Sequence, residues 1–178
     1  YGKDIWSPVK NGRIPVIPLK GKLFPDQINE FEKIIKKFKP DIVFSCKPRL
    51  PSLQLGLLFK EKYRVPLILD IDDYEMSFIK DKSILTVDEF LIKNKNDILN
   101  EVEPYSDFWT RLSNDLVRFA DKIVVSNCAL QGEFGGVRIP HVRNEEIFDP
   151  HRYDKEVQRN KYGIPINSKV VMFFVTPR

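Results

Sequence analysis

The 178-residue sequence has little of what metal sites, disulfide frameworks and membrane spans require. It contains only two cysteines, Cys46 and Cys128, and two histidines. Neither cysteine has a histidine at zinc-ligand spacing, so we expect both thiols to be small core residues in a reducing compartment. The longest uninterrupted apolar run, residues 170–175, is far shorter than the roughly 20 residues of a membrane-spanning helix. The sequence therefore predicts no structural metal, no disulfide and no transmembrane helix.

The sequence also lacks a strong excess of either charge. Its 29 Lys and Arg residues against 25 Asp and Glu residues give a net charge of +4. The densest basic run is Lys33, Lys36, Lys37 and Lys39, and it lacks the interleaved aromatic residues of a nucleic-acid surface. We expect these lysines to be solvated, with contact to anionic lipid headgroups as the alternative. No nucleic-acid partner is predicted.

Short apolar segments alternate with helical patterns along the chain. We expect strands at residues 42–46, 66–69, 123–125, 137–139 and 170–174, and helices at residues 28–38, 52–63, 87–100, 105–120 and 154–162. Such alternation is typical of βαβ units. The predicted fold class is α/β, a Rossmann-like and mostly parallel sheet with helices on both faces.

Ligands of parallel sheets bind beyond the carboxyl ends of the strands, and two charged residues follow the first strand. Lys47 and Arg49 stand there, separated by a proline. Two cations at this position could hold a phosphate or a carboxylate, with Arg49 offering a bidentate fork. Alternatively, both are loop charges that pair with a neighbouring acidic loop.

The acidic loop follows the second strand and contains Asp70, Asp72, Asp73 and Glu75. Carboxylates this close together could bind Mg²⁺ or raise one another's pKa. They could equally cap a turn and pair with nearby cations. An Asp-x-Asp after a strand also resembles metal-dependent glycosyltransferases of the GT-A type and haloacid-dehalogenase-like phosphatases. The phosphatase pattern has Thr or Val where Tyr74 stands.

His141 and Arg143 follow the predicted strand at residues 137–139, in the stretch that leads to the last helix. A lone histidine is more often a structural residue than a catalytic one. Both residues are nevertheless candidates because of their place after a strand.

The segment IPHVRNEEIFDP, residues 139–150, is followed by a polar helix, then YGIP and VVMFFVTPR. It resembles the crossover between the two domains of GT-B glycosyltransferases of family 4. That family commonly reads P-N-G-V-D, three variable residues, F, one residue, P, and Pro140, Phe148 and Pro150 keep this frame. The upstream segments FKPDIVFSCKPRLPS, VPLILDIDDYE and ADKIVVSN are similar to the family's first domain. The resemblance covers about residues 38–178.

The sequence departs from the family pattern at several positions. Val175 stands where the family usually has glycine, and His141 and Val142 replace Asn-Gly. The family's first strand with its Gly-rich loop is not seen before Tyr1, and its pair of donor-site glutamates would lie after Arg178. We therefore expect the chain to be a fragment of a longer protein.

The resemblance implies a partial GT-B fold in three parts. Residues 1–140 would form a Rossmann-like acceptor-side domain that lacks its N-terminal part, residues 141–168 an interdomain bridge and helix, and residues 169–178 the first strand of a donor-side domain. The complete protein would be a retaining glycosyltransferase. It would transfer a sugar from a nucleotide sugar to a polysaccharide, a lipid-linked acceptor or a small molecule, without a bound metal or cofactor. It would lie in the cytoplasm or peripherally on the inner face of the membrane.

The resemblance also implies roles for individual residues, although it assigns no catalytic residue. The acceptor and cleft candidates are Lys47, Arg49, Asp72, Asp73, Glu75, His141 and Arg143. Thr176 and Arg178 are the candidates for contact with the donor diphosphate. Two other functions stay open, a haloacid-dehalogenase-like phosphatase that uses Asp70 and Asp72, and a non-catalytic α/β binding module.

Overall fold

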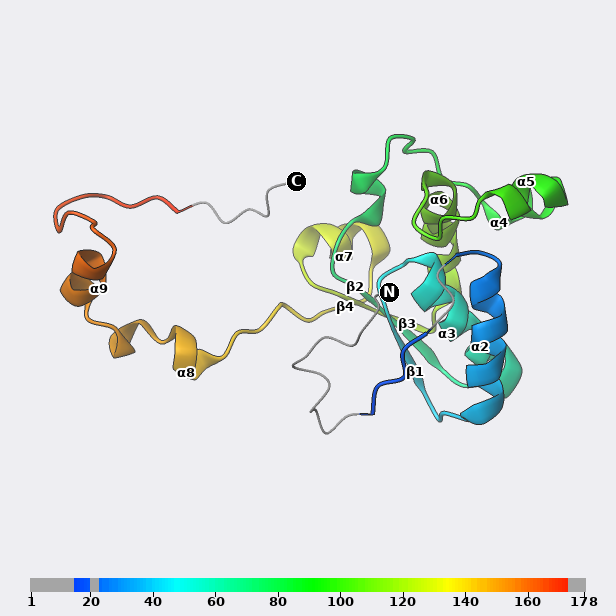
Figure 1. Ribbon diagram of the computed structural model, residues 1–178, viewed down its shortest axis with the longest axis horizontal. Coiled ribbons are helices and arrows are strands. Elements are labelled where there is room, and N and C mark those ends of the chain that lie inside the picture. Colours follow the sequence, from blue (N-terminus) through cyan, green and yellow to red (C-terminus); the bar gives the residue numbers. More distant parts are fainter. Residues whose placement is uncertain (1–14, 20–22, 173–178) are drawn as a thin grey trace. The chain divides into compact units, whose positions relative to one another are not determined.

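The computed structural model describes residues 15–19 and 23–172 (Figure 1). The chain divides into two compact units, Tyr1–Pro140 and His141–Arg178. The first unit is an α/β structure in which helices flank a four-stranded, entirely parallel sheet. This finding confirms the predicted fold class.

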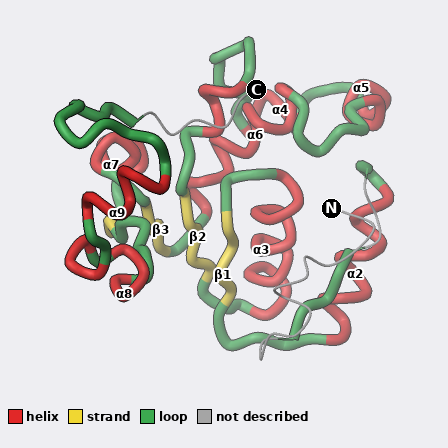
Figure 2. Tube along the Cα trace, turned by 60° about the vertical axis from the view of Figure 1, so that its left-hand side comes forward, coloured by secondary structure: helices red, strands yellow, loops and turns green. Residues whose placement is uncertain are grey.

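The strands of the sheet follow one another in space in the same order as in the sequence. They are β1 (Val43–Cys46), β2 (Leu67–Ile71), β3 (Lys122–Val125) and β4 (Val137–Arg138). Figure 2 shows β1, β2 and β3 side by side. Because all four strands run in the same direction, their carboxyl ends meet at one edge of the sheet.

The main core lies on one face of the sheet. Leu67, Leu69 and Ile71 of β2 are fully buried there, and they alternate with less buried residues, as expected for a strand. Leu53 of helix α3 (Leu50–Tyr63) and Leu130 of helix α7 (Cys128–Phe134) belong to the same core cluster. The connections between consecutive strands therefore supply the helices that bury this face.

The other face of the sheet is more open. Phe44 of β1 is 56% exposed and Val137 of β4 is 60% exposed. Cys46 alternates with the buried Ser45 and is exposed, and Cys128, at the first turn of α7, is exposed too. The prediction that both cysteines are core residues is therefore wrong. Cys46 lies on the open face of the sheet, and Cys128, just beyond β3 as expected, is on the exposed side of the first turn of α7.

Helices pack around the core in two further clusters. Helix α2 (Asp26–Lys37) buries Phe31 and Ile35 against Phe59 of α3. Helix α6 (Asp107–Leu116) buries Trp109, whose ring centroid lies 4.6 Å from that of Phe24. A 3₁₀ turn, η2 (Val117–Phe119), continues α6 toward β3. These clusters hold α2, α3 and α6 in place beside the sheet.

The single helix predicted at residues 87–100 is instead two short helices. These are α4 (Val87–Leu91), with a capping box between Thr86 and Glu89, and α5 (Lys95–Asn100), which Asn94 caps. The Asn94 side chain accepts a hydrogen bond from the backbone N–H of Asn96, at 2.8 Å. Asparagine favours such local bonds over continued helix, so the chain breaks there.

The described part of the second unit, residues 141–172, contains α8 (Glu145–Phe148), η3 (Pro150–Arg152) and α9 (Lys155–Lys161). Arg159 of α9 donates hydrogen bonds to the carbonyl oxygens of Pro165, at 2.6 Å, and Ser168, at 2.9 Å. Of the strand predicted at residues 170–174, residues 170–172 form no strand, and residues 173 and 174 lie outside the described residues. Among the described residues, no helix is long and apolar enough to cross a membrane.

Two glycines in helices test how closely α3 packs on the sheet. A Cβ on Gly56 would lie 2.8 Å from Leu67 Cδ1, whereas a Cβ on Gly132 of α7 would have no neighbour within 4 Å. We expect Gly56→Ala to lower the free energy of unfolding by about 1–3 kcal/mol because it overpacks the core. Gly132→Ala should raise it by up to about 1 kcal/mol through helix propensity. Urea unfolding measures the change in the free energy of unfolding for each variant. Equal stabilisation by the two changes would contradict the close packing of α3 on β2.

Asp121, directly before β3, ties α3 to the start of β2. Its carboxylate accepts hydrogen bonds from Lys60 Nζ, at 2.7 Å, and from the Leu67 N–H, at 2.8 Å, and these bonds hold the pKa of Asp121 below its usual value. A carboxyl group with a lowered pKa contributes stability above its unfolded-state pKa, near 4, and that contribution is lost as the pH falls through the folded-state pKa.

We therefore expect Asp121→Asn to lower the free energy of unfolding at pH 7, and we expect the difference from the unchanged protein to shrink below about pH 4. Urea unfolding across the acid range measures this difference. Asp41→Asn, at an exposed position before β1, is the control, and its effect should be small at every pH. A difference for Asp121→Asn that stays constant down to pH 2 would refute the contribution of these hydrogen bonds.

Candidate functional site

The loops after β1 and β2 meet at the carboxyl edge of the sheet. Lys47 directly follows β1 and has a left-handed backbone, with φ at 69°. Its N–H donates to the carbonyl oxygen of Asp70, at 2.8 Å, so the pairing between the strands continues into the loop. The N–H of Arg49 donates to the carbonyl oxygen of Lys47, at 2.8 Å, in a tight turn that leads into α3. This turn places both cationic side chains beside the loop that follows β2.

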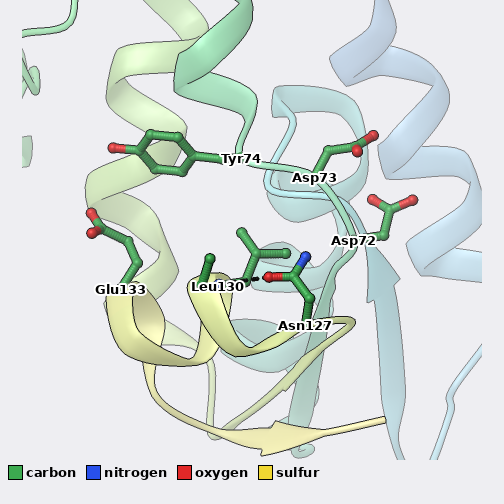
Figure 3. A pocket seen from close by; sticks show the side chains of 7 residues that line it. Asp72, Asp73, Tyr74, Asn127, Leu130 and Glu133 are labelled. Atoms are coloured by element: carbon green, nitrogen blue, oxygen red, sulfur yellow. Dashed lines mark hydrogen bonds between the residues drawn. The ribbon is translucent and has the colours of Figure 1, made fainter. Parts of the chain in front are cut away.

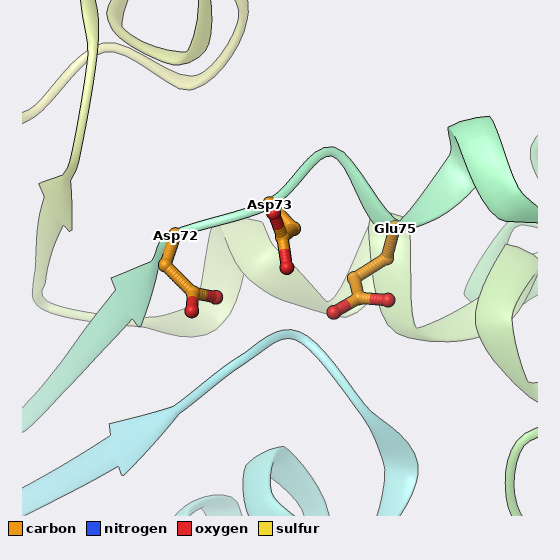
Figure 4. A group of neighbouring side chains, drawn as sticks. All are labelled: Asp72, Asp73 and Glu75. Atoms are coloured by element: carbon orange, nitrogen blue, oxygen red, sulfur yellow. The ribbon is translucent and has the colours of Figure 1, made fainter. Parts of the chain in front are cut away.

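The Lys47 ammonium lies among three carboxylates of the β2 loop. Its Nζ is 3.0 Å from Asp72 Oδ1, 2.8 Å from Asp73 Oδ2 and 3.6 Å from Glu75 Oε1. Figure 4 shows these carboxylates pointing from their segment toward the loop after β1. We use the name charged cluster for five residues: Lys47, Arg49, Asp72, Asp73 and Glu75.

Arg49 supplies the second cation of the charged cluster. It forms an ion pair with Glu75, whose side chain is only 3% exposed at the start of the 3₁₀ turn η1 (Glu75–Phe78). The guanidinium carbon also lies 5.3 Å from the centroid of the Tyr105 ring, within range of a cation–π contact. A buried carboxylate is costly without a partner, and the guanidinium of Arg49 is that partner for Glu75.

The charged cluster keeps Lys47 protonated. Burial lowers the pKa of Lys47, but hydrogen bonds to Asp73 and Asp72 and their negative charges outweigh burial, and the pKa ends above its usual value. A lysine that acts as a nucleophile or a general base needs a lowered pKa instead. The chemistry open to Lys47 is therefore electrostatic, and consists of holding and orienting neighbouring carboxylates.

The three carboxylates of the charged cluster could in principle share a metal ion. Oxygens of Asp72, Asp73 and Glu75 lie within 4.8 Å of one another. The ammonium of Lys47, however, stands within 3.6 Å of each of these acids. A divalent cation would have to displace that ammonium, so the residues fit an ion-pair network better than a metal site.

A pocket of about 360 Å³ adjoins the charged cluster. Its lining residues come from the β2 loop and from α7 with the residue that caps it: Asp72, Asp73, Tyr74, Asn127, Ala129, Leu130 and Glu133. Figure 3 shows Tyr74 and Glu133 on one side, Asp72 and Asp73 on the other, and Asn127 and Leu130 between them. The carboxylates of Asp72 and Asp73 point away from Tyr74 in this view.

Local hydrogen bonds fix the walls of this pocket. Ser126 Oγ donates to the carbonyl oxygen of Asp72, at 2.9 Å, and so joins the loops after β2 and β3. Asn127 Oδ1 accepts from the Leu130 N–H, at 3.0 Å, and caps α7. The ring of Tyr74 packs on Phe134, with 6.0 Å between centroids. Burial raises the pKa of Tyr74, and the charge of Glu133 and a hydrogen bond to it raise the pKa further.

The structure brings together five of the residues that the sequence nominates, namely Lys47, Arg49, Asp72, Asp73 and Glu75. His141 and Arg143 are exposed in the second unit, where they help to line an open hollow of about 760 Å³. Thr176 and Arg178 lie outside the described residues. Asp70 lies within β2, opposite Cys46 and Val124, and it alternates with the buried Leu69 and Ile71.

Sequence reasoning did not single out Tyr74 or Glu133 as site residues. Tyr74 stands inside the acidic loop, so its position next to a strand end was a usable signal. Glu133 lies within α7, beyond the strand end, and only the packing of that helix brings it to the edge of the sheet. No sequence pattern marked Glu133.

No known protein-family model matches this chain, and no curated protein matches its sequence. The resemblance to family 4 glycosyltransferases therefore stays a prediction.

The ion pair between Arg49 and Glu75 can be tested by a double-mutant cycle. Arg49→Met should lower the free energy of unfolding by about 2 kcal/mol, because it leaves a buried carboxylate with only Lys47 nearby. Glu75→Gln combined with Arg49→Met should cost less than the sum of the single changes, with a coupling of at least about 1 kcal/mol by urea unfolding.

The exposed pair Arg64 and Glu61, at the end of α3, is the matched control. The same cycle with Arg64→Met and Glu61→Gln should give a coupling below about 0.5 kcal/mol, because water screens exposed charges. Equal couplings in the two pairs would contradict the buried character of the charged cluster.

Proposed function

We propose that the chain is the acceptor-side portion of a retaining GT-B glycosyltransferase. The observation that carries the proposal is the meeting of residues 47–49 and 72–75, charged loops from two strands, beside a pocket at the carboxyl edge of a parallel sheet. Ligands of open α/β sheets bind at this edge. The fixed polar groups and the pocket are what a protein needs to orient a second substrate for a transfer reaction.

The two loops that meet are also two segments that resemble the glycosyltransferase family. CKPRLPS contains Lys47 and Arg49, and DIDDYE contains the three carboxylates of the charged cluster. The resemblance lies in the sequence, whereas the meeting of the two loops is a property of the fold. Their agreement supports the proposal.

In the proposed reaction, an acceptor hydroxyl passes its proton to the leaving diphosphate oxygen, and the acceptor oxygen bonds to the anomeric carbon of the donor sugar. The bond from that carbon to the nucleoside diphosphate breaks, and the diphosphate leaves. The residues of the carboxyl edge would hold the acceptor in place. Lys47 and Arg49 would keep the carboxylates of the β2 loop in fixed positions, so that little ordering is needed when the acceptor binds.

The partners in this proposal are a nucleotide-sugar donor and a glycan or lipid-linked acceptor. The protein would work in the cytoplasm, at the inner face of the membrane where its acceptor is lipid-linked. The phosphatase alternative is less well supported because Asp72, its acid/base residue, lies 3.0 Å from the protonated Lys47. An acid/base residue has to reach the substrate, whereas the Asp72 carboxylate is held within the charged cluster by Lys47.

The proposal is tested on the native protein, purified from its source and incubated with a panel of UDP-, GDP- and ADP-sugars and candidate glycan acceptors. We expect acceptor-dependent release of one nucleoside diphosphate, with the anomeric configuration of the donor kept in the product, as ¹H NMR shows. Asp73→Asn should reduce transfer about tenfold through poorer acceptor orientation, and the distant surface change Glu61→Gln should leave transfer unchanged.

The absence of transfer from every donor would reject the proposal. If the same protein released phosphate from a phosphomonoester in a Mg²⁺-dependent reaction that Asp70→Asn abolished, the phosphatase alternative would take its place.

A further inference from the structure

The pocket between the charged cluster and α7 has a lining that restricts what it can bind. Three of its seven lining residues are acidic, Asp72, Asp73 and Glu133, and none of the seven is Lys or Arg. Its volume of about 360 Å³ falls in the range of small-molecule sites. The restriction therefore comes from charge rather than from size.

The charge around the pocket is negative even after the cations of the charged cluster are counted. Lys47 and Arg49 face three carboxylates within the cluster, and Glu133 adds a fourth carboxylate across the pocket. Both cations are already in contact with carboxylates and do not line the pocket. A phosphate group placed there would be repelled, and no described side chain of the lining could neutralise it.

The same pocket offers what a neutral, hydroxyl-rich ligand needs. Tyr74 is partly exposed, at 41%, and offers an aromatic ring to the pocket, while Ala129 and Leu130 add apolar lining. Glu133 contributes carboxylate oxygens, which accept hydrogen bonds from hydroxyl groups. Sugars combine apolar C–H faces with hydroxyl edges, and they match a site with an aromatic wall and a few fixed acceptors.

The polar groups of the pocket are held in place before any ligand arrives. Asn127 is fixed as the cap of α7, and its Nδ2 donates to Ser126 Oγ, at 3.2 Å. Tyr74 packs on Phe134 and interacts with Glu133. Such a site loses little side-chain freedom on binding, which favours a weakly interacting ligand such as a sugar.

We propose that this pocket binds an unphosphorylated sugar residue of the acceptor and rejects acceptors that carry a phosphate at that position. The inference rests on the proposed function and narrows its acceptor class. It can be examined on the 178-residue chain itself, because binding at this pocket involves only residues of the first unit.

The test measures binding of matched sugars by saturation-transfer NMR and calorimetry. The probes are glucose, mannose and galactose, the 6-phosphate of each, and glucosamine. At least one hexose should bind, and its 6-phosphate should bind at least tenfold more weakly at low salt. The difference should narrow in 0.5 M NaCl, since salt screens the repulsion. Glucosamine should bind at least as well as glucose.

Two variants locate the binding at this pocket. Tyr74→Ala should weaken hexose binding at least fivefold, whereas Tyr162→Ala, at an exposed tyrosine of the second unit, should not change it. Glu133→Gln should reduce the discrimination against the 6-phosphate, whereas Glu61→Gln on α3 should keep it. Thermal unfolding of each variant shows whether the fold is intact. If Tyr74→Ala does not fold, the discrimination between hexose and 6-phosphate by Glu133→Gln shows whether binding is at this pocket.

Several results would overturn the inference: no binding of any hexose, equal or tighter binding of a 6-phosphate, or unchanged binding in both pocket variants. If the native protein transfers sugars but the pocket variants leave transfer and acceptor affinity intact, this inference fails and the proposed function stands. If hexoses bind as described but no nucleotide sugar supports transfer, the sugar site stands and the proposed function fails.

Discussion

The ion pairs between the loops after β1 and β2 are the interaction on which the structure of the carboxyl edge of the sheet depends. Asp72, Asp73 and Glu75 lie within a few residues of one another and would repel each other if left alone. Lys47 and Arg49, which arrive from the neighbouring strand, make this arrangement stable. The loop after β2 is thereby fixed, and one wall of the adjoining pocket is fixed with it.

The parallel sheet makes this interaction possible. Because β1 and β2 are parallel and in register, Cys46 pairs with Asp70, and the residues after both strands emerge side by side. The next strand extends the arrangement, since Ser126 after β3 donates a hydrogen bond to the Asp72 carbonyl and Asn127 caps α7. Three consecutive loops thus build one edge, in which the charged cluster and the pocket share the loop after β2.

The sequence was a good guide to this edge because its signals are local. Short apolar runs of three to five residues marked most of the strands, and the parallel arrangement followed from their alternation with helices. The rule that ligands bind at carboxyl ends then brought Lys47, Arg49 and the acidic loop into one candidate site. Pairing of the cations with the acidic loop was one of the alternatives stated from the sequence, and the structure shows that pairing.

The remaining features depend on packing that sequence patterns do not encode. Burial of Cys46 depends on which face of β1 meets helices, and the apolar run around it was equally compatible with both faces. The break at Asn94 depends on a side-chain hydrogen bond that competes with helix, and apolar periodicity does not reveal such a bond. Glu133 becomes part of the pocket only through the position of α7 beside the β2 loop.

The central claim is that an acceptor binds at the carboxyl edge of the sheet. Hydrogen–deuterium exchange of the native protein, with and without an unphosphorylated glycan acceptor, tests it most directly. The account predicts added protection in residues 72–75 and 127–133 and little change in residues 60–66, which lead into the start of β2 at the opposite edge of the sheet. Protection confined to other segments, with residues 72–75 and 127–133 exchanging as in the free protein, would contradict the account.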